Sequence, residues 1–564
     1  MKKTYIYLGI ILIIACILRF WALGAIPSSP DWDEVALGYN AYSILHTGKD
    51  EYGAVLPFVL RSFGDYKPAL YSYLTIPSVA VFGLTVFAAR FPSAVMGVLG
   101  VLLMYFFVKE LFGEYGNKQN KTGNYAEILA LVSAFLLAIS PWQIQFSRTA
   151  FETNTGLTFN LLVGFFFLKG LKKPWMLSLA ALFAGLNLAV YQSERVFTPL
   201  LVVALVIIYW RELFAVSKKY LSFAIVVGLL AVLPTALFII TNSSSLERAE
   251  GTSIFSEKTQ AVQDNVTRLA NDTKNHDVIG MVIDNRRVIY IKEIIGGYLS
   301  HFDPNWLFVE GDNDRHHPPD MGIMYLLDLP FLLIGIYFFI FGNFGKKIKS
   351  VVVSWLFLAP VPASVTFDVP HAVRTMNMLP MLLILAAIGY IAFFQLLLKK
   401  QNARHKDQIV RIIVICVFVF CAIWNFAYYL NQYFVQLNYF DAPDWQYGYQ
   451  QAIGQIEKIQ GNYKKVVVSN KTPMDQSYIF FLFYLEYPPQ QYQKLALSGQ
   501  NLGADKHFDK YEFRTIDWGK DKNKKDILYV GAASDFPTTI NPKVTIANPD
   551  GTPAILLVDP KDNL

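Results

Sequence analysis

The chain has 564 residues, of which 54% are hydrophobic, 15% aromatic and 16% charged. A soluble domain averages about 25% charged residues, so this sequence has too little charge to cover a water-facing surface. The net charge of +6 does not indicate nucleic-acid binding, because many of the lysines and arginines lie in short loops between apolar blocks. These blocks approach the roughly twenty residues that a helix needs to cross a bilayer. The composition therefore predicts a multi-pass membrane protein.

The first predicted element is a span over residues 4–23, preceded by Lys2 and Lys3. Positive charges before a span place the N-terminus in the cytoplasm. A cleavable signal peptide is the alternative, disfavoured by the length of the apolar run. The chain therefore reaches the outer face at Gly24.

Segment 67–87 is apolar but contains Pro68, Pro77 and Gly83. If it spans the membrane, every later lysine-rich loop falls on the outer face, against the positive-inside rule. If it lies in the interface, the later loops fall inside. We therefore expect an interfacial segment here, and an interfacial helix over residues 34–45.

The remaining predicted spans alternate with lysine-rich loops. They cover residues 91–111, 125–140, 153–169, 175–190, 196–210, 220–240, 321–341, 351–367, 375–398 and 409–430. The loops assigned to the cytoplasm contain Lys118, Lys121, Lys172, Lys173, Lys218, Lys219, Lys346, Lys347, Lys349, Lys399, Lys400, Arg404 and Lys406. This pattern predicts a mainly α bundle of about eleven spans, with the C-terminus outside.

Two domains are expected: a transmembrane domain over 1–430 and an extracytoplasmic α/β domain over 431–564. The first contains an outer loop at 24–90 and a large outer loop at 241–320. The second contains a helical pattern at 447–459 and β-branched runs at 465–469, 527–530 and 554–558, the last after an Asp-Gly turn.

Asp33 and Glu34 follow the first span, at the outer membrane surface. A carboxylate there can act as a general base on an acceptor hydroxyl or amine. The alternative is a cap on the interfacial helix, where acids favour the helix dipole. Position alone leaves both interpretations open.

Four cations lie at the outer ends of predicted spans: Lys67, Arg148, Arg195 and Arg374. Arginine clamps phosphate through several donors, and lysine binds it as a point charge. Snorkelling to the headgroups is the alternative for Lys67. Glu152 lies four residues after Arg148, so the two would share a helical face.

A collar of cations and acids at the outer surface predicts an anionic ligand delivered by the membrane. A polyprenyl-phosphate sugar fits, with its tail between spans, its phosphate on the cations and its sugar towards the acids. Tyr71, Tyr191 and His371 lie beside these charges and are the expected lining residues. The sequence has no phosphate-binding loop before a helix, consistent with chemistry that needs no nucleotide.

His316 and His317, with Asp312, Asp314 and His301 nearby, raise the question of a metal site. A polar loop before two prolines is the favoured interpretation. No metal ligand is therefore predicted, and a divalent cation is left open as a cofactor.

The order of several short motifs resembles one enzyme family. These are Asp33-Glu34, the Lys-Pro-x-Leu-Tyr segment at 67–71, Val-Phe-Gly at 81–83, Arg-Phe-Pro-Ser-Ala at 90–94, Ser-Pro at 140–141 with Arg148 and Glu152, and Pro-His-Ala-Val-Arg at 370–374. The chain resembles the C-type integral membrane glycosyltransferases. It is most similar to bacterial members of the dolichyl-phosphate-mannose–protein mannosyltransferase superfamily, meaning glycosyltransferase family 39 and its aminoarabinose-transferring relatives.

The resemblance implies inverting transfer of a hexose or pentose from a polyprenyl-phosphate donor, at the outer face of the bacterial cytoplasmic membrane. It implies Asp33 as the catalytic acid residue with Glu34 beside it, and Glu152 as a second acidic position where relatives often have Asp. The acceptor is a lipid, a protein or a polysaccharide. A secondary transporter, a non-catalytic scaffold and a lipid-linked oligosaccharide ligase are the alternatives.

Overall fold

The computed structural model describes residues 2–118, 125–241, 251, 253–255, 260–398 and 405–563. Lys121, Lys399, Lys400, Arg404 and parts of the predicted large outer loop lie outside the described residues. The chain forms two compact units. Unit 1 is Met1–Leu18, Met96–Phe146 and Glu152–Tyr429, and unit 2 is Arg19–Val95, Ser147–Phe151 and Leu430–Leu564. The first outer loop therefore groups with the C-terminal region.

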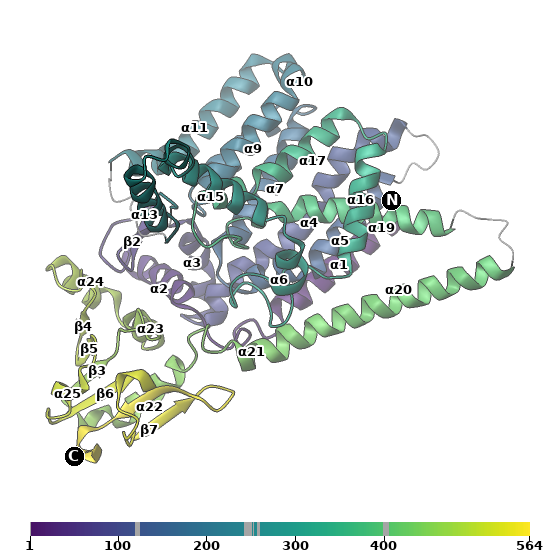
Figure 1. Ribbon diagram of the computed structural model, residues 1–564. Helices are drawn as coiled ribbons and strands as arrows, with labels where there is room; N and C mark the ends of the chain where they lie inside the picture. Colours follow the sequence, from purple (N-terminus) through teal and green to yellow (C-terminus); the bar gives the residue numbers. More distant parts are fainter. Residues whose placement is uncertain are drawn as a thin grey trace. The chain divides into compact units, whose positions relative to one another are not determined.

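Unit 1 is a helix bundle (Figure 1). Within it, α8 packs against α7 and α11, and α16 packs against α19. Its helices, some of which extend into unit 2, are α1 (Lys2–Phe20), α4 (Val86–Lys118), α5 (Tyr125–Ile139), α6 (Pro141–Arg148), α7 (Glu152–Gly170), α8 (Met176–Asn187), α9 (Glu194–Ile208), α10 (Trp210–Ala215), α11 (Lys218–Thr241), α13 (Gln260–Lys274), α14 (Val278–Ile283), α15 (Arg286–Ser300), η2 (Trp306–Glu310), α16 (Asp328–Phe341), α17 (Lys346–Leu358), α18 (Val361–Ser364), η3 (Met376–Met378), α19 (Leu379–Leu398) and α20 (His405–Asn431).

Every predicted span contains a helix, but the helices differ in length. Among the described residues, five are long and apolar enough to cross a membrane, in α1, α4, α11, α19 and α20. The bent pair of α5 and α6, with an angle of 56°, would make a sixth. A helix of 15 residues, such as α9, rises about 22 Å, less than the roughly 30 Å of a bilayer core. The total of about eleven spans therefore stays a prediction.

Glycines let α16 and α19 approach very closely. A Cβ atom on Gly335 would lie 1.8 Å from the carbonyl oxygen of Leu385, and one on Gly389 would lie 1.8 Å from that of Phe331. Small residues at such crossings are typical of helix packing in membranes, where backbone contact replaces hydrophobic driving force.

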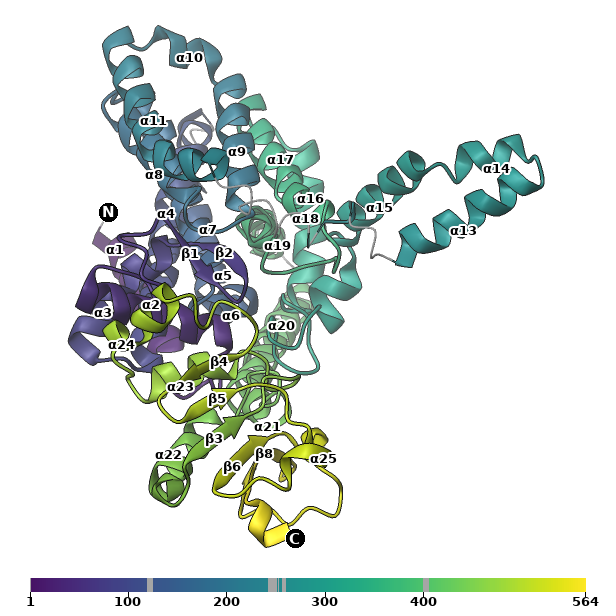
Figure 2. The same ribbon diagram turned by 90° about the vertical axis from the view of Figure 1, so that its left-hand side faces the viewer.

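The predicted large outer loop is largely helical where it is described. Helices α13, α14 and α15 contact one another and form an arm, and α15 also contacts α18 (Figure 2).

Unit 2 contains a six-stranded mixed sheet in the order β4-β5-β3-β6-β8-β7. The central strand β3 is parallel to β5 and β6, and the other pairs are antiparallel. The elements are α2 (Trp32–Thr47), β1 (Val59–Ser62), β2 (Asp65–Pro68), α3 (Leu70–Phe82), η4 (Gln432–Gln436), α21 (Leu437–Phe440), α22 (Tyr449–Ile459), η5 (Gln460–Asn462), β3 (Lys465–Val468), α23 (Ser477–Tyr484), α24 (Pro489–Leu497), β4 (Lys506–Phe508), β5 (Tyr511–Phe513), α25 (Trp518–Asp521), β6 (Ile527–Gly531), η6 (Ala533–Asp535), β7 (Val544–Ala547), β8 (Pro553–Val558) and η7 (Pro560–Asn563).

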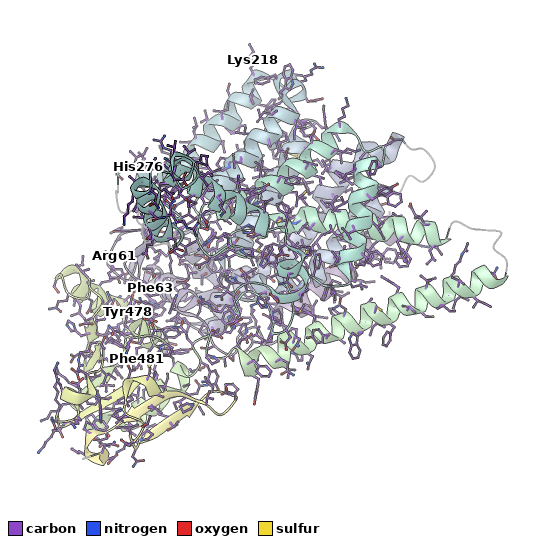
Figure 3. The ribbon with its side chains drawn as sticks, in the orientation of Figure 1. Arg61, Phe63, Lys218, His276, Tyr478 and Phe481 are labelled. Carbon is purple, nitrogen blue, oxygen red and sulfur yellow. The ribbon has the colours of Figure 1, made fainter. Side chains whose placement is uncertain are left out.

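Side chains of the first outer loop and the C-terminal region share one core in unit 2. The Tyr39 hydroxyl of α2 donates to the Tyr487 carbonyl at 2.9 Å. The ring centres of Phe63 and Tyr478 are 6.2 Å apart. Both residues are labelled in Figure 3. Because these segments bury each other's aromatic surface, neither completes its core alone.

Two local features differ from a simple interfacial arrangement. Segment 67–87 begins with a strand, since Lys67 and Pro68 belong to β2, which pairs with β1, and helix α3 begins at Leu70. In the interfacial helix expected over residues 34–45, Leu37, Tyr39 and Ala41 are buried against protein, whereas Leu45 is exposed.

Candidate functional site

Asp33 lies in the first turn of α2, and its carboxylate pairs with the ammonium of Lys67 on β2. The Asp33 side chain is 37% exposed, whereas that of Lys67 is 9% exposed. The Lys67 ammonium also lies 4.7 Å from the centre of the Phe63 ring. Unit 2 thus brings together a predicted base and a predicted phosphate ligand, with the acid on the accessible side.

The cap of α2 is formed by other residues. Asp31 is the N-cap, and its Oδ1 accepts a hydrogen bond from the Glu34 N–H at 2.8 Å. Glu34 completes a capping box with Asp31. The Asp-x-x-Glu spacing of residues 31–34 is the signal that sequence reasoning missed. Since Asp31 is the N-cap, the cap interpretation fits Glu34 better than Asp33.

Glu34 is buried in a bidentate pair with Arg90 of α4. The Arg90 Nε donates to Oε2 at 2.8 Å, and Nη2 donates to Oε1 at 3.0 Å. The Ala150 N–H also donates to Oε2 at 2.8 Å. Charge-assisted bonds of this kind are about twice as strong as neutral ones. Glu34 therefore fixes the segments around it, and Arg90 is a partner to which the sequence assigned no role.

Arg148 is fully buried at the end of α6. It donates to the carbonyls of Arg19 and Ile26, at 3.2 Å each. Its guanidinium lies 5.4 Å and 4.9 Å from the ring centres of Tyr433 and Phe434, within cation–π range.

The expected shared helical face of Arg148 and Glu152 was wrong. Helix α6 ends at Arg148 and α7 begins at Glu152, with non-helical residues between them. The i,i+4 rule applies only along one continuous helix. Glu152 is buried in the first turn of α7.

Tyr71 is a core residue of unit 2. It is fully buried on α3, and its hydroxyl donates to the Ala89 carbonyl at 2.9 Å. Tyr191, in unit 1, is half-buried in the turn before α9.

The two predicted cations of unit 1 each donate to a main-chain carbonyl. Arg195 donates to the Leu188 carbonyl at 3.2 Å and to Gln192 Oε1 at 2.6 Å. Arg374 donates through Nη1 to Thr366 Oγ1 at 2.6 Å and to the Phe367 carbonyl at 2.9 Å. Both guanidiniums are half-buried and remain proposals as phosphate ligands.

His371 lies in a polar cluster that joins two loops of unit 1. Its ring centre is 5.0 Å from that of His316. Asp312 Oδ2 accepts from His316 Nδ1 at 2.9 Å and from the Ala372 N–H at 2.7 Å. The main-chain N–H of His371 donates to His301 Nε2 at 3.2 Å. His317 instead donates through Nδ1 to its neighbouring Pro318 carbonyl at 2.8 Å, and Asp314 is exposed.

Burial shifts the titration of this cluster. It lowers the pKa of His371 well below the ordinary value, and the pKa of His301 to about 4. Burial alone would raise the pKa of Asp312, but facing His316 and the Ala372 N–H hold it below its usual range. Asp312 is therefore a carboxylate, and His301 and His371 are neutral imidazoles, near pH 7.

A second buried polar cluster was not predicted. The Glu194 carboxylate accepts from the side-chain amides of Asn377 and Asn160, at 2.7 Å each. The Asn187 amide lies 3.3 Å from the same carboxylate and donates to Thr198 Oγ1 at 2.9 Å. The signal was present, because asparagines in apolar helices require partners. This network joins α7, α8, α9 and η3.

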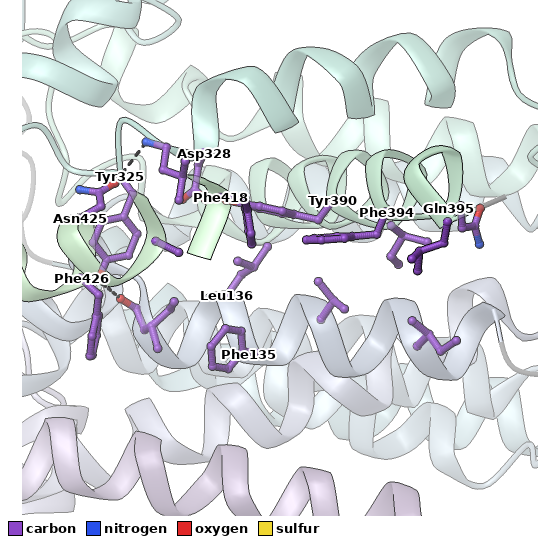
Figure 4. Close-up of a pocket in the computed structure, with 17 residues that line it drawn as sticks. Phe135, Leu136, Tyr325, Asp328, Tyr390, Phe394, Gln395, Phe418, Asn425 and Phe426 are labelled. Atoms are coloured by element: carbon purple, nitrogen blue, oxygen red, sulfur yellow. Dashed lines mark hydrogen bonds between the residues drawn. The ribbon is translucent and has the colours of Figure 1, made fainter. Parts of the chain in front are cut away.

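An apolar cavity of about 880 Å³ lies in unit 1, lined by residues of α5, α19 and α20 and by Asp328 at the start of α16 (Figure 4). Its wall includes the aromatic rings of Phe135, Phe394 and Phe418. The polar groups at one end are paired, since the Tyr390 hydroxyl donates to Asp328 Oδ1 at 2.7 Å. The cavity is near the upper end of the range of about 300–1,000 Å³ for ligand pockets.

Residues 66–238 match the model of the family described as dolichyl-phosphate-mannose-protein mannosyltransferase. No curated protein sequence matches the chain significantly.

Solved structures have a similar fold. ArnT from Cupriavidus metallidurans bound to undecaprenyl phosphate has a TM-score of 0.56 and 13% identity, over 97% of each chain. Its apo state has a TM-score of 0.54 and 12% identity, also over 97% of each chain. The oligosaccharyltransferase AglB from Archaeoglobus fulgidus, in complex with an inhibitory peptide and a dolichol-phosphate, has a TM-score of 0.48 and 13% identity, over 94% of this chain and 69% of that chain.

The predicted fold class, a mainly helical bundle with the C-type glycosyltransferase fold and a small C-terminal sheet, is confirmed by the similarity to ArnT. Residues 66–238 are therefore similar to the dolichyl-phosphate-mannose-protein mannosyltransferase family, and the chain as a whole has a fold similar to that of ArnT.

Proposed function

We propose that this chain transfers one sugar, with inversion, from a polyprenyl-phosphate donor to an acceptor at the outer face of the cytoplasmic membrane. The superfamily supports sugar transfer from a lipid-linked donor. The undecaprenyl phosphate bound by ArnT suggests the class of lipid carrier.

The apolar cavity supports a lipid-linked donor. Its lining of aromatic and aliphatic side chains suits a polyisoprenoid tail and offers little to a polar solute.

The assignment of the base rests on the different exposure and pairing of Asp33 and Glu34. Glu34 is 2% exposed and held by Arg90 and the Ala150 N–H, so it has no access to an acceptor. Asp33 is 37% exposed and pairs with Lys67. We assign Asp33 as the general base and Glu34 as a positioning residue.

The reaction then follows from ordinary acid–base chemistry. The Asp33 carboxylate takes the proton of the acceptor hydroxyl or amine as that atom attacks the anomeric carbon. The bond between the anomeric carbon and the phosphate oxygen breaks, and its electron pair leaves with the polyprenyl phosphate. Lys67 stabilises the leaving phosphate once donor binding draws it from Asp33. Attack opposite the leaving group inverts the anomeric centre.

The other predicted residues keep supporting roles in this proposal. Arg148, Arg195 and Arg374 remain candidate phosphate ligands, because a guanidinium has five N–H donors in a fixed fork. Glu152, Tyr191 and His371 are proposed around the sugar and acceptor.

The test is transfer of a radiolabelled sugar from synthetic polyprenyl-phosphate donors to membranes that lack this chain, with purified protein added. We expect Asp33→Asn to lower kcat by about 10²–10⁴-fold without changing the thermal midpoint. Asp505→Asn, at an exposed acid of unit 2, is the matched control. Full activity in Asp33→Asn would refute the base assignment. Transfer only of preassembled oligosaccharides would instead identify a ligase.

A further inference from the structure

Two loops of unit 1 bring three metal-ligating side chains together. Asp312 and His316 lie between η2 and α16, and His371 lies between α18 and η3. One carboxylate oxygen and one nitrogen from each imidazole all lie within 4.8 Å of one another. His316 is buried, and the other two residues are half-buried.

Two ligand atoms of this cluster lack protein partners. Asp312 Oδ1 and His371 Nδ1 are buried, and neither has a hydrogen-bond partner within the described part of the chain. A buried polar atom without a partner costs free energy, and native proteins rarely leave one so. Two such atoms in one cluster indicate that something else satisfies them.

We propose that Asp312, His316 and His371 bind a divalent transition metal, with Zn²⁺ as the best fit. Two imidazoles and one carboxylate match the ligands that Zn²⁺ prefers, whereas Mg²⁺ and Ca²⁺ favour oxygen alone. At Zn–ligand distances of about 2.0–2.1 Å, tetrahedral ligand atoms lie roughly 3.4 Å apart. The ligand atoms lie within 4.8 Å of one another, so they need to approach by at most about 1.4 Å.

The surrounding contacts hold the ligands in place. Asp312 Oδ2 accepts from His316 Nδ1 at 2.9 Å and the Ala372 N–H at 2.7 Å, which orients the carboxylate. His301 Nδ1 donates to the Gly297 carbonyl at 2.6 Å, and its Nε2 accepts from the His371 N–H. Supporting hydrogen bonds of this kind are general in zinc sites.

The proposed site has three protein ligands and one open coordination position. Three protein ligands leave a fourth tetrahedral position for water or an anionic oxygen. A bound ion would tie the loop before α16 to the loop before η3. The predicted polar loop at Asp312–His317 is, on this proposal, a metal-binding loop completed by His371, distant in sequence.

The test uses the full-length protein, purified in detergent with a tag that contains no histidine. Elemental analysis after dialysis is expected to find about one zinc per chain. Asp312→Asn and His371→Gln should each lower the zinc affinity, measured by competition with a chelator, at least about tenfold, because loss of a supporting hydrogen bond alone costs that much. His507→Gln, at an exposed histidine of unit 2, is the matched control and should retain the metal.

Metal reconstitution of the wild-type protein tests the proposal even if the variants misfold. Wild-type protein stripped with a chelator should regain thermal stability on addition of Zn²⁺ but not Mg²⁺, and Co²⁺ should give the visible absorption of a tetrahedral site. The absence of bound zinc together with no Zn²⁺-dependent rise in thermal midpoint would overturn the proposal. Equal binding by His371→Gln and wild type would also overturn it.

Discussion

Arg90 is a fully buried cation that connects three segments of unit 2. Besides its bidentate pair with Glu34, it donates through Nη1 to the carbonyls of Leu23 at 3.2 Å and Pro27 at 3.0 Å, and through Nη2 to that of Ser29 at 2.8 Å. Replacing it with Met keeps much of the volume and removes every donor. The Glu34 carboxylate is then left charged and largely unpaired.

The expected cost follows from this geometry. Removing one partner of a buried ion pair costs about 3–5 kcal/mol, because the remaining charge stays desolvated. For a unit of about 150–250 residues, 1 kcal/mol shifts the thermal midpoint by about 2–4 °C. We therefore expect Arg90→Met to lower the midpoint of unit 2 by about 6–20 °C.

The assay is thermal unfolding in detergent, followed by tryptophan fluorescence, for Arg90→Met, Glu34→Leu and the double variant. Removing both charges leaves no buried ion, so the double variant should lose less than the two single losses combined. Arg61→Met is the matched control. Arg61 donates to the Leu502 carbonyl at 3.3 Å on an exposed surface, so its loss should cost less than about 1 kcal/mol.

Two results would refute the reasoning. The first is additive losses in the double variant, which would show that the charges are not coupled. The second is an unchanged midpoint in Arg90→Met. Transfer activity supplies a further contrast, because Glu34→Leu should lose activity together with stability, whereas Asp33→Asn should lose activity alone.

Three further predictions concern other sites. Lys67→Met should raise KM for the donor at least about tenfold while stability changes by under about 1 kcal/mol, since the Asp33 carboxylate it leaves is partly hydrated; an unchanged KM would remove Lys67 from the phosphate site. Burial first, then neighbouring Asp50, raises the pKa of Glu51 from 4.5 to about 8. Because the folded-state pKa is the higher one, its contribution to stability is full below about pH 4.5 and lost as pH rises towards 8. The thermal midpoint should therefore fall less between about pH 5 and pH 8.5 in Glu51→Gln than in wild type, and equal slopes would contradict this. Gly335→Ala should cost at least about 1–3 kcal/mol through the clash with α19, whereas Gly113→Ala, where a Cβ meets nothing within 4 Å, should be neutral or stabilising; equal midpoints would show that α16 can move aside.

Much of the fold was predictable from local patterns. Apolar blocks predicted a helix in every span, and β-branched runs predicted β3, β6 and β8 of the sheet. The short strands β4 and β5 escaped notice, because three-residue strands carry too little periodicity to be distinguished from loops. Strand β2 was not predicted either, because a proline such as Pro68 suits the first turn of a helix as well as an edge strand.

The candidate site was predictable only as a set of residue types. The sequence shows Asp33 and Glu34 as neighbours but could not tell which one is the base. Neighbouring residues at the start of a helix differ in burial only because different segments pack around them. The contacts of Arg90 and Ala150 with Glu34 distinguish the two acids, because they bury Glu34.

By itself, the sequence determined that this is a multi-pass membrane protein with helical spans, a C-terminal region of mixed structure and charged residues at the ends of spans. Hydrophobic length and alternation are local properties, so they can be read along the chain. Tertiary structure decided which polar groups meet. It joined Lys67 to Asp33 and His371 to Asp312 and His316, because burial and pairing depend on segments far apart in sequence.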